Sequence, residues 1–156
     1  MNAPSMANAS DGDPLQNGKS YYMKGNGKNI TTRADWGTDW KRWDFVKAFD
    51  HYNTINETAK PVTLEHDSSN NCWKMKMSNS TWSGYEYIIR SSNNNLYLDT
   101  KIEATCWKID KDKEGYGTRI FESQSSQYWK VNGSSLSNWI ISSTIEADYF
   151  VFTPVS

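Results

Sequence analysis

Long apolar runs are missing from this sequence, and so is a surplus of charge of either sign. The apolar stretches, such as Tyr149–Val151, fall far short of the roughly 20 residues that a membrane-spanning helix needs. The 156 residues include 17 Lys and Arg against 18 Asp and Glu, which gives a net charge of −1. Because nucleic acids and anionic lipid surfaces are bound by clusters of positive charge, we expect neither nucleic acid nor a membrane as a partner.

The residues that most often carry catalysis are also scarce. The chain has 2 His residues, His51 and His66, so acid–base chemistry would depend on carboxylates in turn-rich segments. The glycines of Gly25-Asn26-Gly27 are predicted to form a hairpin turn rather than a phosphate loop, because no helical pattern follows them. We therefore predict a protein that acts by binding, with no enzymatic activity, no cofactor and no metal.

Cysteine is rare as well: the chain has 2, Cys72 and Cys106, each followed by Trp. Their spacing fits no zinc motif and leaves two alternatives, one disulfide or two buried free thiols. Residues 1–13 are small and polar, and are predicted to be a flexible segment ahead of one domain spanning 14–156. This segment lacks the pattern of a signal peptide. We expect a secreted or vacuolar protein after removal of a leader, or alternatively a cytoplasmic one.

Aromatic residues are abundant although the chain is weakly hydrophobic. They make up 14% of the sequence, with 8 Trp and 9 Tyr, while all hydrophobic residues together reach 37%. Short alternating or apolar runs recur between Asn, Gly, Ser and Asp, and none shows a sustained helical period. This pattern predicts an all-β fold. The twelve expected strands lie near residues 20–24, 29–33, 42–48, 61–65, 72–77, 85–90, 96–100, 106–110, 119–122, 128–131, 137–142 and 149–153.

Aromatic residues also mark a loose internal repeat. Trp43, Trp73 and Trp107 follow one another at intervals of roughly thirty residues, each within a predicted strand, and Phe150 lies in the last strand. One aromatic strand in each repeated unit indicates a closed barrel with pseudo-symmetry. We expect all four side chains to lie in the barrel core, Trp43 because it alternates with Phe45.

Several segments resemble the plant Kunitz (soybean trypsin inhibitor) family. Ser10–Met23 contains that family's opening signature: an Asp-Gly pair, a Leu, an Asn-Gly turn and two Tyr. Lys60–Leu64, Cys106–Asp110 and Asp148–Pro154 then follow in the order that the family would place them. The resemblance implies a β-trefoil, which has twelve short strands in a pseudo-three-fold barrel capped by hairpins. The chain departs from the family where Phe152-Thr153-Pro154 replaces its usual Cys before Pro.

The resemblance also implies a function and a binding loop. Family members inhibit proteases through an exposed loop that corresponds here to His66, Asp67, Ser68, Ser69, Asn70 and Asn71. Inhibition of cysteine proteases through another loop also occurs in the family, so the resemblance implies a protease of the serine or the cysteine class as partner. Asn17 matches an Asn that supports the loop His66–Asn71 by hydrogen bonding. The loop has no Arg or Lys for a trypsin-like pocket, which predicts a target with a pocket for small polar residues.

A carbohydrate-binding lectin is the alternative function. Sugar sites combine an aromatic platform with polar side chains, and Trp36, Asp39, Trp40 and Trp82 offer both in predicted loops. Gln127-Tyr128-Trp129 is similar to the Gln-x-Trp motif of ricin-type lectins, although we expect Trp129 to pack in the core. Fold alone does not decide between these functions. In either case we expect a monomer.

Overall fold

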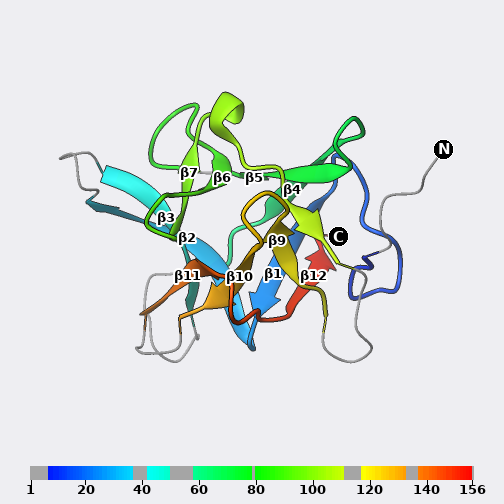
Figure 1. The fold of residues 1–156 in the computed structure, drawn as a ribbon. Coiled ribbons are helices and arrows are strands. Elements are labelled where there is room, and N and C mark those ends of the chain that lie inside the picture. The colour runs from blue at the N-terminus through cyan, green and yellow to red at the C-terminus, as the bar shows by residue number, and fades with distance from the viewer. Residues whose placement is uncertain are drawn as a thin grey trace.

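The chain folds into an all-β structure in which one helical turn accompanies the strands. A computed structural model describes residues 7–36, 42–49, 58–78, 80–110, 117–132 and 137–155 (Figure 1). Within these ranges the twelve predicted strands are confirmed, with shifts of up to three residues at their ends. They are β1 (Ser20–Gly25), β2 (Lys28–Trp36), β3 (Arg42–Phe49), β4 (Val62–Asp67), β5 (Cys72–Met77), β6 (Tyr87–Arg90), β7 (Leu96–Asp99), β8 (Lys108–Ile109), β9 (Ile120–Glu122), β10 (Gln127–Val131), β11 (Ser137–Ser143) and β12 (Phe150–Pro154). A 3₁₀ turn, η1 (Lys101–Glu103), precedes β8.

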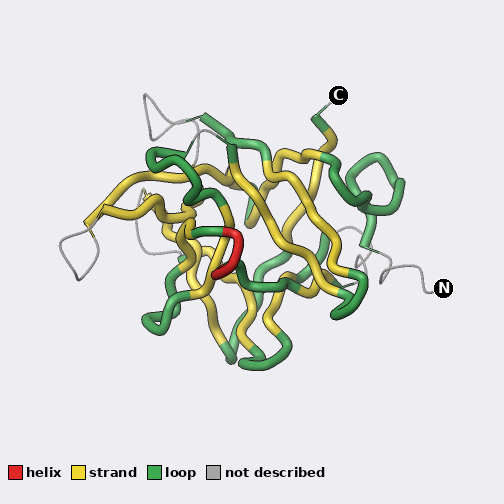
Figure 2. The backbone as a smooth tube through the Cα atoms, turned by 90° about the horizontal axis from the view of Figure 1, so that it is seen from above, coloured by secondary structure: helices red, strands yellow, loops and turns green. Residues whose placement is uncertain are grey.

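Antiparallel pairing closes the sheet into a barrel. β1, β2, β3, β7, β6, β5 and β4 form a complete circuit of seven strands, because β4 pairs again with β1. Closure leaves this circuit without an unpaired edge. Figure 2, seen from above, shows the strands around the molecule with η1 on the near side.

A second circuit passes through β1, β4, β5, β8, β9 and β12. β12 pairs with β1, and β8 pairs with β9. Single bridges complete it: Trp73 pairs with Trp107 next to β8, and Thr118, just before β9, pairs with Phe150. The hairpin of β10 and β11 joins the first circuit where β11 pairs with β3.

Large aromatic side chains fill the core. The Trp129 ring meets the rings of Trp107 and Phe150 edge to face, with centroids 5.4 and 5.5 Å apart. Trp73 is 3% exposed, and Trp107 and Phe150 are fully buried, as their repeated strand positions predicted. Edge-to-face packing suits the ring quadrupole, so the contacts add to the free energy gained by burial.

Trp43 differs from the prediction: it is only half-buried. Val46 and Ala48 point into the core, and the two-residue period of β3 turns Asp44 to the same side. Trp43 therefore lies on the outer face, where its ring contacts those of Tyr97 at 4.9 Å and Tyr85 at 6.0 Å.

Part of the N-terminal segment for which the sequence predicts flexibility packs against the barrel. Ala7 and Ala9 are buried in the core cluster, and the Ser10 N–H donates to the Phe152 carbonyl at 2.7 Å. The small side chains of Ala7 and Ala9 let this backbone lie close to β12. The low overall hydrophobicity of the segment gives no sign of this packing. Residues 1–6 lie outside the described ranges. No helix in the described part of the chain is long and apolar enough to cross a membrane.

Gly25 provides a test of how tightly the barrel is packed. A Cβ at this position would overlap the ring of Phe150, which is fully buried. We expect Gly25→Ala to lower the free energy of unfolding by about 1–3 kcal/mol, as overpacking of cores does. Urea unfolding monitored by Trp fluorescence measures the loss.

A Phe150→Leu background supplies the control, because the ring that causes the overlap is then gone. Gly25→Ala should cost less in that background than in the native chain, a coupling expected for residues in contact. Equal costs in the two backgrounds would show that the overlap with Phe150 is not the cause.

Candidate functional site

The predicted binding loop is the tip of the β4–β5 hairpin, and it is shorter than expected. His66 and Asp67 belong to β4, where they pair with Trp73 and Cys72. Only Ser68–Asn71 form the turn, and all four residues are exposed. We call these four residues the tip. The six-residue loop of the sequence prediction is corrected in this respect, because strand pairing continues two residues beyond Glu65.

The tip is a folded turn that Asp67 holds closed. One oxygen of its carboxylate accepts the N–H groups of Ser69 and Asn70 at 3.0 and 3.3 Å, and the other accepts the Asn70 side-chain amide at 2.9 Å. Asn71 adopts a positive φ of 50°, a conformation that Asn tolerates better than most residues. The Asp-Ser-Ser-Asn-Asn sequence thus contains the residues that such a turn requires.

The hydrogen bonds to Asp67 lower the pKa of its carboxyl group below the ordinary value of 3.8. The largest cause is the bond from the Asn70 side chain, and the two backbone N–H groups and the charge of Lys74 act in the same direction. All of these donors favour the ionised form. The closed turn therefore has its full set of bonds at neutral pH.

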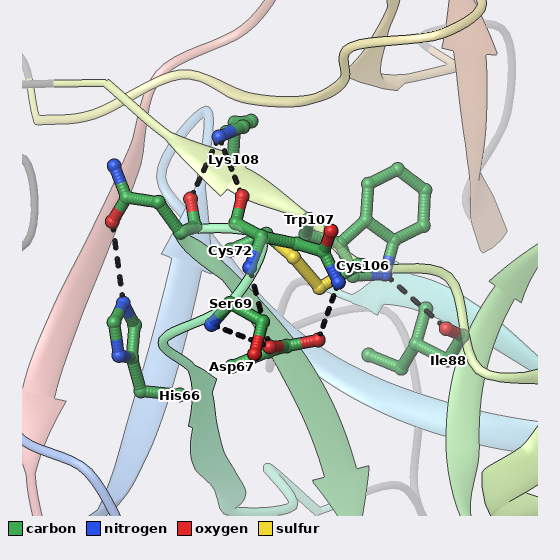
Figure 3. The surroundings of a disulfide bond; sticks show 10 residues. His66, Asp67, Ser69, Cys72, Ile88, Cys106, Trp107 and Lys108 are labelled. Atoms are coloured by element: carbon green, nitrogen blue, oxygen red, sulfur yellow. Dashed lines mark hydrogen bonds between the residues drawn. A yellow bond between two sulfur atoms is a disulfide. The ribbon is translucent and has the colours of Figure 1, made fainter.

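Lys108 clamps the tip from a distant part of the chain. Its ammonium donates to the carbonyl oxygens of Asn70 and Asn71 at 3.0 and 2.8 Å (Figure 3). The backbone bridge between Trp73 and Trp107 places Lys108 there, with N–H···O distances of 2.7 Å in both directions. Sequence reasoning missed this contact. The lysine and its partners are 37 and 38 residues apart, so no local pattern marks it.

A disulfide secures the base of the tip. Cys72, which follows the tip directly, is bonded to Cys106, with their Cα atoms 5.3 Å apart (Figure 3). This contact decides between the two alternatives that the sequence left open. The His66 ring packs at 4.6 Å on that of Trp73, and one of its nitrogens lies 3.3 Å from the side-chain oxygen of Asn71.

Asn17 reaches the same hairpin from the N-terminal side. Its side-chain oxygen accepts the N–H of His66 at 2.9 Å. The neighbouring Gly18 N–H donates to the carbonyl of Leu64 at 2.6 Å, which holds the segment beside β4. This is the type of contact that the family resemblance implied for Asn17, although the residue is exposed here. Its support of a binding loop stays a prediction.

The tetrapeptide of the tip occurs a second time, in the turn between β6 and β7. Ser91-Ser92-Asn93-Asn94 repeats Ser68-Ser69-Asn70-Asn71, and Asn94 likewise has a positive φ, of 65°. The Asn94 carbonyl accepts the N–H of Ser142, so this second turn lies against β11. The two turns share a sequence but project from different places, which makes the second turn a natural control for the first.

The residues proposed for sugar binding are only partly described. Trp82 is 41% exposed, on a loop that the buried Asp44 anchors by accepting the N–H and hydroxyl of Thr81 at 2.7 and 2.6 Å. Asp39 and Trp40 lie outside the described residues, as does the side chain of Trp36. Trp129 is fully buried, as expected, so the Gln-x-Trp segment offers no aromatic platform for a sugar.

One group of potential metal ligands lies at this site within the described residues. The ligand atoms of Asp67, Cys72 and Cys106 fall within 4.8 Å of one another. The two sulfurs are bonded to each other, however, and a metal requires the thiolate form. We assign no metal to this group.

Comparison with known proteins identifies the fold. No protein-family model matches this chain, and no curated protein matches its sequence. Among solved structures, it is similar to a mutant of the Bauhinia bauhinioides kallikrein inhibitor in complex with human kallikrein 4. The identity is 17% and the TM-score 0.70, over 99% of both chains. The sequence resemblance to the Kunitz family is thereby confirmed at the level of the fold.

Proteins with other ligands share this fold. A water-soluble chlorophyll protein from Brassica oleracea var. botrytis, with chlorophyll b, matches at 13% identity and a TM-score of 0.70, over 97% of this chain and 99% of its own. The lysenin pore matches at 14% identity and a TM-score of 0.69, over 97% of this chain. The present chain spans about half of lysenin's length, since it covers 50% of that chain. At such identities the likeness concerns the fold alone.

A pH titration tests the role of Asp67 in closing the tip. Because the pKa of its carboxyl is lowered on folding, the hydrogen bonds are complete above pH 3.8 and are lost as the pH falls through a lower midpoint. We expect the amide signals of Ser69 and Asn70 in ¹⁵N NMR spectra to change position together as the pH falls through that midpoint.

The matched variant is Asp67→Asn, whose side-chain oxygen still accepts a hydrogen bond but does not ionise. Its Ser69 and Asn70 amides should keep constant positions across the same acid range. A shift that persists in this variant would assign the transition to another group.

Proposed function

We propose that this protein is a protease inhibitor of the Kunitz type, which acts by binding and blocks a protease cleft with the tip of the β4–β5 hairpin. The observation that carries the proposal is the locked tip. Four exposed small residues project from the barrel and are held by Asp67, Lys108, Asn17 and the disulfide. Full-length likeness to inhibitors bound to trypsin and kallikrein 4 supports the proposal through the fold.

We further infer that the fold is a β-trefoil. The twelve strands divide in chain order into three groups of four, and the second circuit uses the first and the last strand of each group. The middle strands form the hairpins β2–β3, β6–β7 and β10–β11. A barrel of six strands with one hairpin for each group is the arrangement that the family resemblance implies.

Rigidity is what the locked tip contributes to binding. Ordering a mobile loop costs free energy at the moment of association, and a loop that is already ordered avoids this cost. Here side chains from both sides hold the turn, and the clamp by Lys108 uses two backbone carbonyls. A partner would therefore meet a preformed surface.

The chemistry of the tip limits its targets. Its side chains are Ser and Asn, so a pocket that contains a carboxylate and selects Arg or Lys would gain little from them. We propose a protease whose pocket accepts small polar residues, as elastase- and subtilisin-like pockets or an asparagine-specific site do. The serine class comes first and the cysteine class is the alternative.

The folded turn also suggests how the tip blocks its target. A substrate enters a protease cleft as an extended strand, whereas the carbonyls of Asn70 and Asn71 are already bonded to Lys108. We propose that the tip enters the cleft as a closed wedge and stays uncleaved. We also propose that the protein is secreted or vacuolar. A disulfide persists in oxidising compartments, which supports such a location.

Ser69→Trp tests the proposal at the residue best suited to change. Ser69 holds the turn through its backbone N–H, so its side chain can be replaced while the bond to Asp67 remains. A Trp at the apex would obstruct entry into a narrow cleft. Titration against a panel of serine, cysteine and aspartic proteases identifies a responsive enzyme, and we expect Ser69→Trp to weaken its inhibition at least about tenfold.

The control is Ser92→Trp, which makes the same change in the identical tetrapeptide of the β6–β7 turn. It should leave inhibition unchanged. Equal inhibition by the native protein and Ser69→Trp would exclude the tip as the binding element. A folded native protein that inhibits no protease in the panel would contradict the function itself.

Glycan binding is a second candidate, favoured by two exposed aromatic residues on one loop. Trp82 and Tyr85 are 41% and 37% exposed on the β5–β6 loop, and the Tyr85 N–H bonds to the Trp82 carbonyl at 3.1 Å. Exposed faces of Trp and Tyr can stack on the apolar face of a sugar.

Binding to a glycan array tests this candidate. We expect Trp82→Ala to abolish the signal of any bound glycan and Ser69→Trp to leave it intact, because the two changes lie on different loops. Absence of binding by the folded native protein would exclude the glycan function.

A further inference from the structure

The tip by itself is too small to form a stable complex. Specific interfaces bury about 800 Å² on each partner and involve roughly 20–30 residues a side. Most of their binding energy comes from a few large side chains that become fully desolvated. The tip has four residues and none of them is large. If the tip binds a protease, further surface beside it must contribute an anchor.

Ile102 has the properties of such an anchor. It lies in η1 and is 90% exposed, although it is fully apolar. Single exposed apolar residues are common on proteins, so exposure alone assigns no role. Ile102 is distinguished by the contacts that hold its turn in place and by the position of that turn relative to the tip.

The turn that carries Ile102 is fixed to the rest of the barrel. Two backbone bonds of 3.1 Å close η1, from Glu103 to Thr100 and from Ala104 to Lys101. The Lys101 ammonium lies 3.4 Å from the carboxylate of Glu65, in the same strand that leads to the tip. An exposed Ile on a fixed turn presents its whole side chain to a partner with little loss of backbone freedom.

Tyr87 supports the contact between η1 and β4. Its hydroxyl donates to both oxygens of Glu65, at 3.1 and 3.0 Å. Burial, followed by the bond and the charge of Glu65, raises the pKa of Tyr87 to about 12. The hydroxyl therefore keeps its proton at neutral pH and continues to orient Glu65 toward Lys101.

A hollow connects η1 with the tip. It has a volume of about 560 Å³ and is lined by Asn70 of the tip, by Glu103 of η1 with Thr105 just after it, and by Gln124 of the β9–β10 turn. The disulfide between Cys72 and Cys106 forms part of its wall. The tip and η1 are thus two rims of one depression, and a partner seated on one rim would extend over the other.

We propose that Ile102 is an apolar anchor for the same protease that the tip blocks, and that it binds an apolar patch beside the protease's cleft. This inference rests on the proposed function and names the second contact that the function needs. The contact surface then runs from the tip across the hollow to η1. The tip occupies the cleft, and burial of Ile102 supplies affinity that small polar residues lack.

Ile145 provides a matched control for this inference. It is also 90% exposed, in the connection between β11 and β12. That connection continues to Asp148 and Tyr149, which line another hollow together with Asn26 and Gly27 of the β1–β2 turn. The β1–β2 turn lies at the far end of β1 from Ser20, which pairs with β4, so Ile145 and Ile102 belong to different ends of the barrel.

The experiment compares Ile102→Ala and Ile145→Ala in inhibition of the responsive protease, together with the dissociation rate of each complex. Loss of one buried Ile from an interface should weaken inhibition by Ile102→Ala about tenfold to a hundredfold, mainly through faster dissociation. Ile145→Ala should match the native protein. Ile102→Leu, which keeps the apolar volume, should retain most of the affinity. Urea unfolding midpoints confirm that all variants are folded.

The outcomes separate this inference from the proposed function. If Ser69→Trp prevents inhibition while Ile102→Ala behaves like Ile145→Ala, the tip is the binding element and Ile102 is no anchor. If both isoleucine variants weaken inhibition equally, the effect is not specific to η1 and the inference is wrong. If the folded native protein inhibits no protease, the proposed function fails, and the inference fails with it.

Discussion

The rings of Trp107, Trp129 and Phe150 meet edge to face in the centre of the barrel, and the remaining structure depends on this contact. The three residues come from the segment before β8, from β10 and from β12, so their packing joins distant parts of the chain. The core cluster combines these rings with aliphatic side chains such as Leu64, Met75 and Ile88. Dense packing then constrains the neighbours: a Cβ at Gly25 or Gly117 would overlap Phe150.

The site on the surface is built from the same core. Trp107 bonds with its indole N–H to the carbonyl of Ile88 and with its backbone to Trp73. Because it is fixed in this way, the residues on either side of it reach the tip: Cys106 bonds to Cys72, and Lys108 donates to the carbonyls of Asn70 and Asn71. The tip is held in place because a core tryptophan positions its clamps, so the packing of the core and the geometry of the tip are linked through one segment.

Much of the fold can be predicted from the sequence, because the signals are local. Alternation and turn residues locate the strands, and the spacing of the tryptophans marks Trp73 and Trp107 as core positions. The sequence predicts less well which face of a strand is buried and whether the ends of the chain pack against the barrel. Trp43 lies outside because Val46 and Ala48 set the phase of β3, and residues 7–13 pack because Ala7 and Ala9 fit a narrow space beside β12. Neither fact is visible in a window of neighbouring residues.

The candidate site, like the fold, has features that the local sequence determines and others that depend on tertiary contacts. The sequence by itself determined where the hairpin turns and that the chemistry of the turn is small and polar, since Asp67, Ser69 and Asn70 make the turn through bonds within three residues. Only the tertiary structure decided that the cysteines bond, that Lys108 clamps the tip, and that η1 and the tip border one hollow. These contacts join residues more than thirty positions apart, and closure of the barrel selects them from the many pairs that the chain could bring together.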